Sequence, residues 1–126
     1  MTINTIGRCL GQAEDGSLWF FCRGCDAPHG LNVGAGTGPR WGYNGNAEAP
    51  TFTPSVLVQH DQWEPPATTL DIAEKIRIGE IKQTKVTKIC HSFVTDGRIQ
   101  YLGDCTHGLS GQTVDLPDWE AAWNNW

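Results

Sequence analysis

The residues of this chain best suited to chemistry are its cysteines, its histidines and one serine that follows a proline. Two of the five cysteines and two of the four histidines fall within one stretch, residues 90–107. This stretch has two apolar runs separated by Asp96-Gly97, which predicts a β-hairpin because glycine accepts the positive φ of a tight turn. A hairpin brings its outer ends together, so we expect Cys90-His91 to lie close to Asp104-Cys105-Thr106-His107.

A second group of metal-binding residue types lies closer to the N-terminus. Cys22-x-x-Cys25 follows an aromatic strand pattern, and its spacing allows both thiolates to bind one ion. His29 offers a third ligand, and a closed structural Zn²⁺ site needs four. Cys90 and Cys105 are both candidates for the fourth position; we predict Cys90 and keep Cys105 as the alternative. A redox role for the Cys-x-x-Cys pair is less favoured, because no helix pattern follows that would lower a thiol pKa.

Ser55 is the candidate nucleophile, at the entry to an expected strand and held there by Pro54. A serine hydroxyl needs a base to take its proton, and that base needs an orienting partner. His91 and His107 are both candidate bases, and Asp104 is the candidate partner. The non-catalytic alternatives are a turn or capping role for the serine and a core or metal-supporting role for the histidines. In another alternative, an open zinc site made from both histidines and a cysteine or Asp104 would activate water.

Short strands joined by many turns must position these residues, because the chain has 15 glycines and 7 prolines. We predict a single domain over residues 1–126 of a mainly β, β-rich α+β class. It would consist of short twisted antiparallel strands around a zinc knuckle, with one or two short helices. The expected strands, besides those of the hairpin, are a weak lead-in strand within 1–17, strands at 18–21 and 40–45, a strand in the 49–58 run that leads into Val56, and one at 112–116. Residues 30–33 could form a return strand after the Cys-x-x-Cys segment.

Residues 60–87 are expected to be a loop and helix insertion, with an exposed loop over 61–69 and a short helix over 70–82. A last helical turn is expected near Pro117. It would place Trp119, Trp123 and Trp126 on one face, most simply packed on the sheet.

Composition excludes several classes of partner. The chain carries 14 acidic and 9 basic residues without a Lys/Arg cluster, so we expect no nucleic acid binding. No run approaches the ~20 apolar residues of a membrane span. The N-terminus lacks a signal-peptide pattern, so we expect a cytoplasmic protein. In that reducing compartment, clustered cysteines favour a metal over disulfides.

The motifs together resemble a known family of small phage and bacterial proteins. They are Trp19-x-Phe21-Cys22-x-x-Cys25-x3-His29, Trp41, Pro50-Thr51-Phe52-x-Pro54-Ser55, Cys90-His91-x-Phe93-x-x-Asp96-Gly97 and Asp104-Cys105-Thr106-His107-x-Leu109-x-Gly111-Gln112-Thr113. Some relatives accompany bacterial ubiquitin-like conjugation operons, in which the component called BubE is a peptidase. The resemblance covers most of the chain outside about residues 60–87.

The resemblance implies a zinc-containing protein with a hydrolytic serine site. Ser55 would be the nucleophile, His91 or His107 the base and Asp104 its orienting group. The substrate would be an amide or ester at the C-terminus of a ubiquitin-like protein or its conjugate.

We therefore predict a zinc-stabilised serine hydrolase of the peptidase type, acting on a protein or peptide. Backbone amides near Gly108 or Gly111 are the candidate oxyanion donors. The competing prediction is a non-catalytic phage zinc-binding module that binds and blocks a host protein. If the chain is phage-encoded, either activity would take place in the host cytoplasm.

Overall fold

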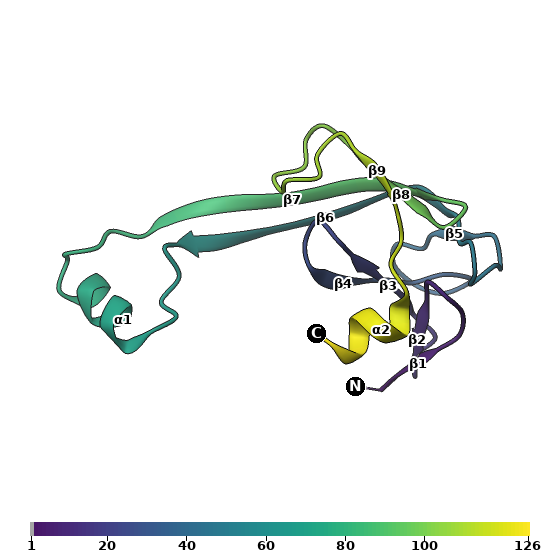
Figure 1. The fold of residues 1–126 in the computed structure, drawn as a ribbon, viewed down its shortest axis with the longest axis horizontal. Helices are drawn as coiled ribbons and strands as arrows, with labels where there is room; N and C mark the ends of the chain where they lie inside the picture. Colours follow the sequence, from purple (N-terminus) through teal and green to yellow (C-terminus); the bar gives the residue numbers. More distant parts are fainter. Residues whose placement is uncertain (1) are drawn as a thin grey trace.

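Two antiparallel sheets and two short helices make up the computed structural model, which describes residues 2–126 (Figure 1). The first sheet has four strands in chain order: β1 (Ile3–Thr5), β2 (Gly11–Ala13), β3 (Leu18–Cys22) and β4 (Ala27–Leu31). The second has five, also in chain order: β5 (Gly42–Tyr43), β6 (Phe52–Glu64), β7 (Thr84–Thr95), β8 (Arg98–Tyr101) and β9 (Thr113–Asp115). The mainly β prediction is confirmed.

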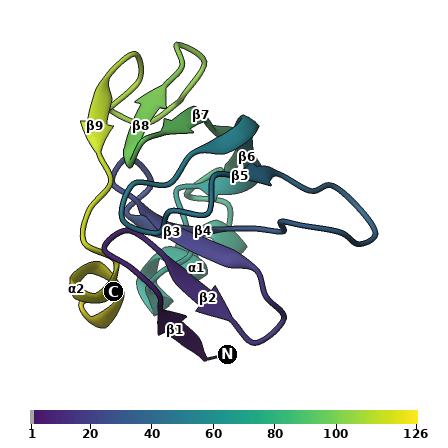
Figure 2. The ribbon, with the colours of Figure 1, turned by 90° about the vertical axis from the view of Figure 1, so that its right-hand side faces the viewer.

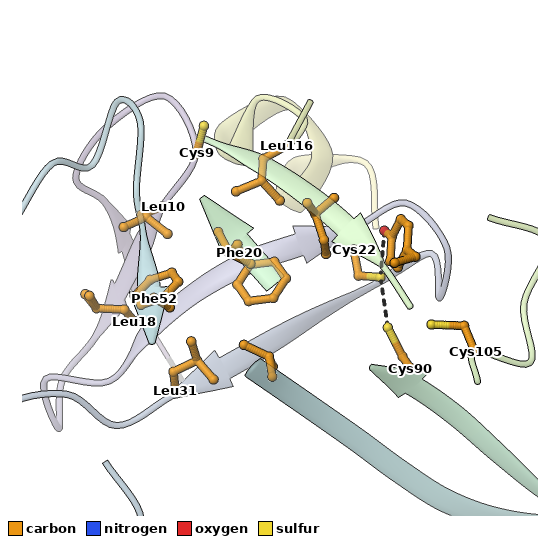
Figure 3. Packing of buried hydrophobic residues seen from close by; sticks show 14 residues of the cluster. Cys9, Leu10, Leu18, Phe20, Cys22, Leu31, Phe52, Cys90, Cys105 and Leu116 are labelled. Carbon is orange, nitrogen blue, oxygen red and sulfur yellow. Dashed lines mark hydrogen bonds between the residues drawn. The ribbon is translucent and has the colours of Figure 1, made fainter. Parts of the chain in front are cut away.

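The main core lies between the two sheets, which Figure 2 shows from one end of the molecule. Phe20 of β3 and Phe52 of β6 are almost completely buried, with ring centroids 6.3 Å apart. Val94 of β7 and Ile99 of β8 belong to the same buried cluster, of which Figure 3 labels Leu18, Leu31 and Leu116 among others. Val94 and Ile99 alternate with exposed residues along their strands, as expected where one face of a sheet is buried, whereas in β3 both Phe20 and Phe21 are buried.

A second cluster forms where α2 (Trp119–Asn124) covers the first sheet. Asp118 caps this helix by accepting a hydrogen bond from the backbone N–H of Ala121 at 2.9 Å. Trp119 is fully buried and stacks on Trp123, with ring centroids 5.4 Å apart. Trp119 and Trp123 therefore pack on the first sheet, as the sequence indicated, whereas Trp126 stacks on Trp123 and stays 64% exposed.

β6 and β7 extend beyond the core as a long two-stranded ribbon that ends at α1 (Leu70–Arg77) (Figure 1). The expectation of a loop over residues 61–69 is wrong for 61–64, which pair with 84–87. This part of the ribbon is held by polar contacts, including a 2.8 Å hydrogen bond from Thr87 to Asp61. Both faces lie away from the main core, so no apolar alternation marks the strand in the sequence. The predicted helix also ends sooner than expected, at Arg77 rather than at residue 82.

The hairpin formed by β7 and β8 positions the candidate sites. Its turn is at Asp96 and Gly97, which have φ values of 50° and 77°. Along β7, Cys90 and Ser92 are buried, whereas Phe93 and Thr95 face outward. Successive side chains on a strand point to opposite faces. Cys90 therefore points between the sheets, and His91 points away from the core.

Candidate active site and metal centre

Three residues distant in the sequence form a hydrogen-bonded chain on the outer face of the five-stranded sheet. His91 Nε2 lies 2.9 Å from Ser55 Oγ, and His91 Nδ1 lies 3.1 Å from Asp104 Oδ2. These are hydrogen-bond distances for a nucleophile, a base and an orienting carboxylate. The structure thus brings together Ser55, His91 and Asp104 from the predicted site residues.

A local irregularity in β6 presents Ser55 to the histidine. The register between β6 and β7 shifts between Phe52 and Val56, so Ser55 lies in a bulged part of the strand. Bulges interrupt regular pairing and change the direction of a side chain. The indole N–H of Trp41 donates to the carbonyl oxygen of Ser55 at 3.1 Å, which fixes the backbone at this point.

The loop that follows β8 holds both the ring and the backbone of His91. Asp104 contacts the imidazole, while the thiol sulfur of Cys105 accepts the His91 backbone N–H at 3.2 Å. At the start of the same loop, the N–H of Leu102 donates to the His91 carbonyl at 2.9 Å. The base is therefore restrained through side-chain and main-chain contacts from one short segment.

This arrangement favours one tautomer of the histidine. A carboxylate beside Nδ1 favours a proton on that nitrogen, which leaves the Nε2 lone pair facing the Ser55 hydroxyl. Nε2 can then accept the serine proton. The side chains of His91 and Asp104 are 25% and 51% exposed, so a solvent-borne substrate can approach them.

His107, the other candidate base, lies elsewhere. Its Nδ1 accepts the backbone N–H of Leu109 at 3.2 Å, and its ring packs edge-on against Tyr101 with centroids 4.6 Å apart. The ring also lies against Gly24 of the Cys-x-x-Cys segment, where a Cβ atom would come within 2.3 Å of it. His107 is therefore on the metal side of the hairpin and is not hydrogen-bonded to Ser55.

The predicted metal ligands converge between the sheets. One potential ligand atom from each of Cys22, Cys25, His29 and Cys90 lies within 4.8 Å of all the others. Cys22 and Cys90 approach to 3.8 Å between sulfur atoms, as the dashed line in Figure 3 shows. These four residues could hold a metal ion.

The chemistry of this group fits zinc. Three thiols and one imidazole are a ligand set of structural zinc sites. His29 Nε2 is buried and has no hydrogen-bond partner within residues 2–126, as expected of a nitrogen placed for a metal. Hydrogen bonds from Cys25 and Cys90 lower the pKa of Cys22 well below its usual range, which favours a thiolate there. The bond to Cys22 in turn raises the pKa of Cys25 to about 11.

Cys105 and His107 form a second possible group with Cys90, again with ligand atoms within 4.8 Å. Cys105, however, already contacts the His91 backbone through its sulfur. Cys90 is therefore the cysteine of the hairpin that meets the Cys-x-x-Cys segment, and Cys105 meets the candidate base. His91 is in neither of these two metal-binding groups.

Some contacts at the site are not evident in the sequence. The hydrogen bonds from Trp41 to Ser55 and from His91 to Cys105 join residues far apart in the chain, and no local sequence pattern predicts them. Of the candidate oxyanion donors, the N–H of Gly111 donates to the carbonyl of Tyr101 and is therefore occupied.

Comparison with known proteins places the chain in a family. The model of the family described as bacterial ubiquitination-like system serine protease (BubE) matches residues 4–102, so the chain belongs to this family. The matched segment includes Ser55 and His91 and ends just before Asp104. No curated protein and no solved structure matches the chain. Within the described residues, no helix has the length and apolar character needed to cross a membrane.

Proposed function

We propose that this member of the BubE family is a zinc-stabilised serine peptidase in which Ser55, His91 and Asp104 are catalytic. Its substrate would be an amide or ester bond at the C-terminus of a ubiquitin-like protein or of its conjugate. The observation that carries the proposal is the chain of two contacts, 2.9 Å and 3.1 Å, that joins serine, histidine and aspartate. The family description supports the peptidase class and a ubiquitin-like substrate.

The reaction follows from the positions of these groups. Ser55 Oγ attacks the substrate carbonyl carbon as its proton passes to His91 Nε2. The resulting imidazolium, stabilised by Asp104, gives that proton to the leaving amine or alkoxide as the scissile bond breaks. Water then hydrolyses the acyl-serine, with His91 again accepting and returning a proton.

Zinc has a structural role in this proposal. Cys22, Cys25, His29 and Cys90 would hold the ion, which would cross-link the β3–β4 hairpin to β7. Because Cys90 directly precedes His91, the cross-link restrains the strand that carries the base. Protein substrates rather than nucleic acids fit the acidic chain, and we place the activity in the cytoplasm, or in the host cytoplasm if the chain is phage-encoded.

Labelling by a fluorophosphonate probe tests the proposal. The zinc-loaded wild type should be labelled and should cleave a ubiquitin-like C-terminal ester, and Ser55→Ala should do neither. Thr53→Ala is the matched control, because it removes an exposed hydroxyl from the same strand two residues away. If folded, zinc-loaded wild type is not labelled, the serine mechanism is wrong. The non-catalytic module that binds a host protein would then be the better account.

A further inference from the structure

Beyond Ser55, one edge of β6 has no partner strand among residues 2–126. β5 pairs with β6 only at Phe52 and Thr53, whereas β7 pairs with the other edge as far as Glu64. The side of β6 facing away from β7 is therefore open from Val56 onward. An open edge can accept an extended chain as an additional strand.

The hydrogen bonds of β7 establish which backbone groups of β6 face this edge. The carbonyl of His91 accepts from Leu102, and that of Ile89 accepts from Thr106, so both residues direct their polar groups away from β6. Their cross-strand partners are Leu57 and Gln59. In an antiparallel ladder, such non-bonded pairs direct the polar groups of both residues to the outer edges.

The same alternation continues along the ribbon to Asp61 and Trp63. Four N–H and four C=O groups, from Leu57, Gln59, Asp61 and Trp63, are therefore directed to the open edge. None of them forms a backbone hydrogen bond outside the β6–β7 ladder to any part of residues 2–126. They cover six residue steps, or about 20 Å at 3.3 Å per residue.

The exposure and composition of this edge suit a docking strand. Leu57 and Trp63 are 52% and 56% exposed, although both are large and apolar. Residues 55–64 contain neither lysine nor proline, the residues that commonly protect strand edges from unwanted pairing. The edge is thus chemically available along its full length.

The open edge begins at the candidate nucleophile. Leu57 is directly opposite His91, and the Ser55 carbonyl two residues earlier is occupied by the Trp41 indole. A chain paired with β6 therefore has to leave the edge at Ser55, beside its hydroxyl group. This continuity with the triad identifies the substrate as the occupant.

We propose that the substrate tail binds as an extended strand on the open edge of β6, pairing with Leu57, Gln59 and Asp61, so that its acyl carbonyl reaches Ser55. The substrate class is therefore an unfolded, non-proline peptide tail of at least about four to six residues, recognised mainly through its backbone. The assignment of the occupant as substrate rests on the proposed function, whereas strand addition can be measured without catalysis.

Amide hydrogen exchange in the Ser55→Ala protein tests the binding mode separately from the chemistry. The probe is an acetylated and amidated pentapeptide of alternating threonine and valine, used at millimolar concentration because these residues favour strands. We expect slower exchange and shifted amide resonances at Leu57, Gln59 and Asp61. An analogue with methylated amide nitrogens should have no such effect.

Proline variants in the Ser55→Ala background localise the edge. Gln59→Pro removes one outward N–H and should weaken peptide binding about fivefold, which is the expected effect of losing the net contribution of one hydrogen bond. Gln59→Ala keeps that N–H and should bind normally. Thr87→Pro removes an N–H that faces the opposite edge of the same ribbon, together with the hydroxyl that donates to Asp61. It should therefore weaken peptide binding no more than Thr87→Ala, which removes the hydroxyl alone.

Three results would overturn the proposal. Peptide contacts that leave the β6 amides unaffected would place binding elsewhere. Equal weakening by Gln59→Pro and Thr87→Pro would indicate general disturbance of the ribbon. Protection of the β6 amides without peptide, in a protein of dimeric mass, would make this edge an interface between two copies. Peptide binding in Ser55→Ala with no wild-type labelling would instead refute only the peptidase assignment.

Discussion

Replacing Asp104 with asparagine tests whether its charge assists His91. The substitution keeps the size of the side chain and removes its negative charge, which lies 3.1 Å from the histidine nitrogen. At this separation, attraction to an imidazolium is about 1.3 kcal/mol in bulk water and about 5 kcal/mol at an effective dielectric constant of about 20. Asp104 is half-exposed, so an intermediate loss of about 2–3 kcal/mol is expected. Asp104→Asn should therefore slow the serine reaction by roughly a hundredfold.

The measurement is the second-order rate of fluorophosphonate labelling, with the zinc content and thermal unfolding of each protein determined in parallel. Asp115→Asn is the matched control, because it removes another exposed carboxylate, which pairs with Arg98 rather than with a histidine. Asp104→Asn should lose labelling without losing zinc, and Asp115→Asn should retain both. A change of less than threefold for Asp104→Asn, or equal losses in the two variants, would refute the orienting role.

Three further predictions separate the roles of the hairpin residues. His91→Ala should lower the labelling rate at least a hundredfold, since a general base contributes about 10²–10⁴; His107→Ala should retain labelling but lower the melting temperature. Cys105→Ala leaves the His91 N–H without its acceptor and should cost about 1–3 kcal/mol of unfolding free energy. Labelling should be slower and the zinc content unchanged. Recovery in Cys105→Ser would identify the lost hydrogen bond as the cause, whereas loss of zinc from Cys105→Ala would contradict this role of Cys105. Chelation or Cys90→Ser should lower the melting temperature by about 10 °C or more. This corresponds to a loss of about 3 kcal/mol of unfolding free energy, at roughly 3 °C per kcal/mol. An unchanged melting curve would argue against a structural ion.

The hairpin and the metal ligand pair could be predicted from the sequence because both depend on short-range patterns. Asp96-Gly97 between apolar runs indicates the hairpin, and Cys22-x-x-Cys25 has the spacing of a metal ligand pair. Each pattern requires only local backbone geometry.

The choice between the two histidines could not be predicted in this way. His91 and His107 belong to the same hairpin and have the same intrinsic chemistry. Their different positions depend on strand alternation, on the bulge beside Ser55 and on the packing of the His107 ring against Gly24. All three depend on contacts between residues far apart in the chain.

The ribbon was missed for a related reason. Part of β6 beyond the core carries polar residues on both faces, so it lacks the period-two apolar pattern that identifies a half-buried strand. Its pairing with β7 is evident only once both strands are in place. The open edge of β6 is a consequence of this pairing, and no separate sequence pattern indicates it.

The order of residues in β7 explains how a structural metal can affect a serine reaction without contacting the substrate. Cys90 and His91 are consecutive, so their Cα atoms are about 3.8 Å apart, and their side chains point to opposite faces of the sheet. A thiolate held by a metal fixes the backbone at Cys90, and the neighbouring histidine must move with it. Productive general-base geometry tolerates only small displacements, since a shift of about 1 Å can cost a hundredfold in rate. Loss of the metal should therefore reduce serine reactivity even in molecules that keep their strands paired.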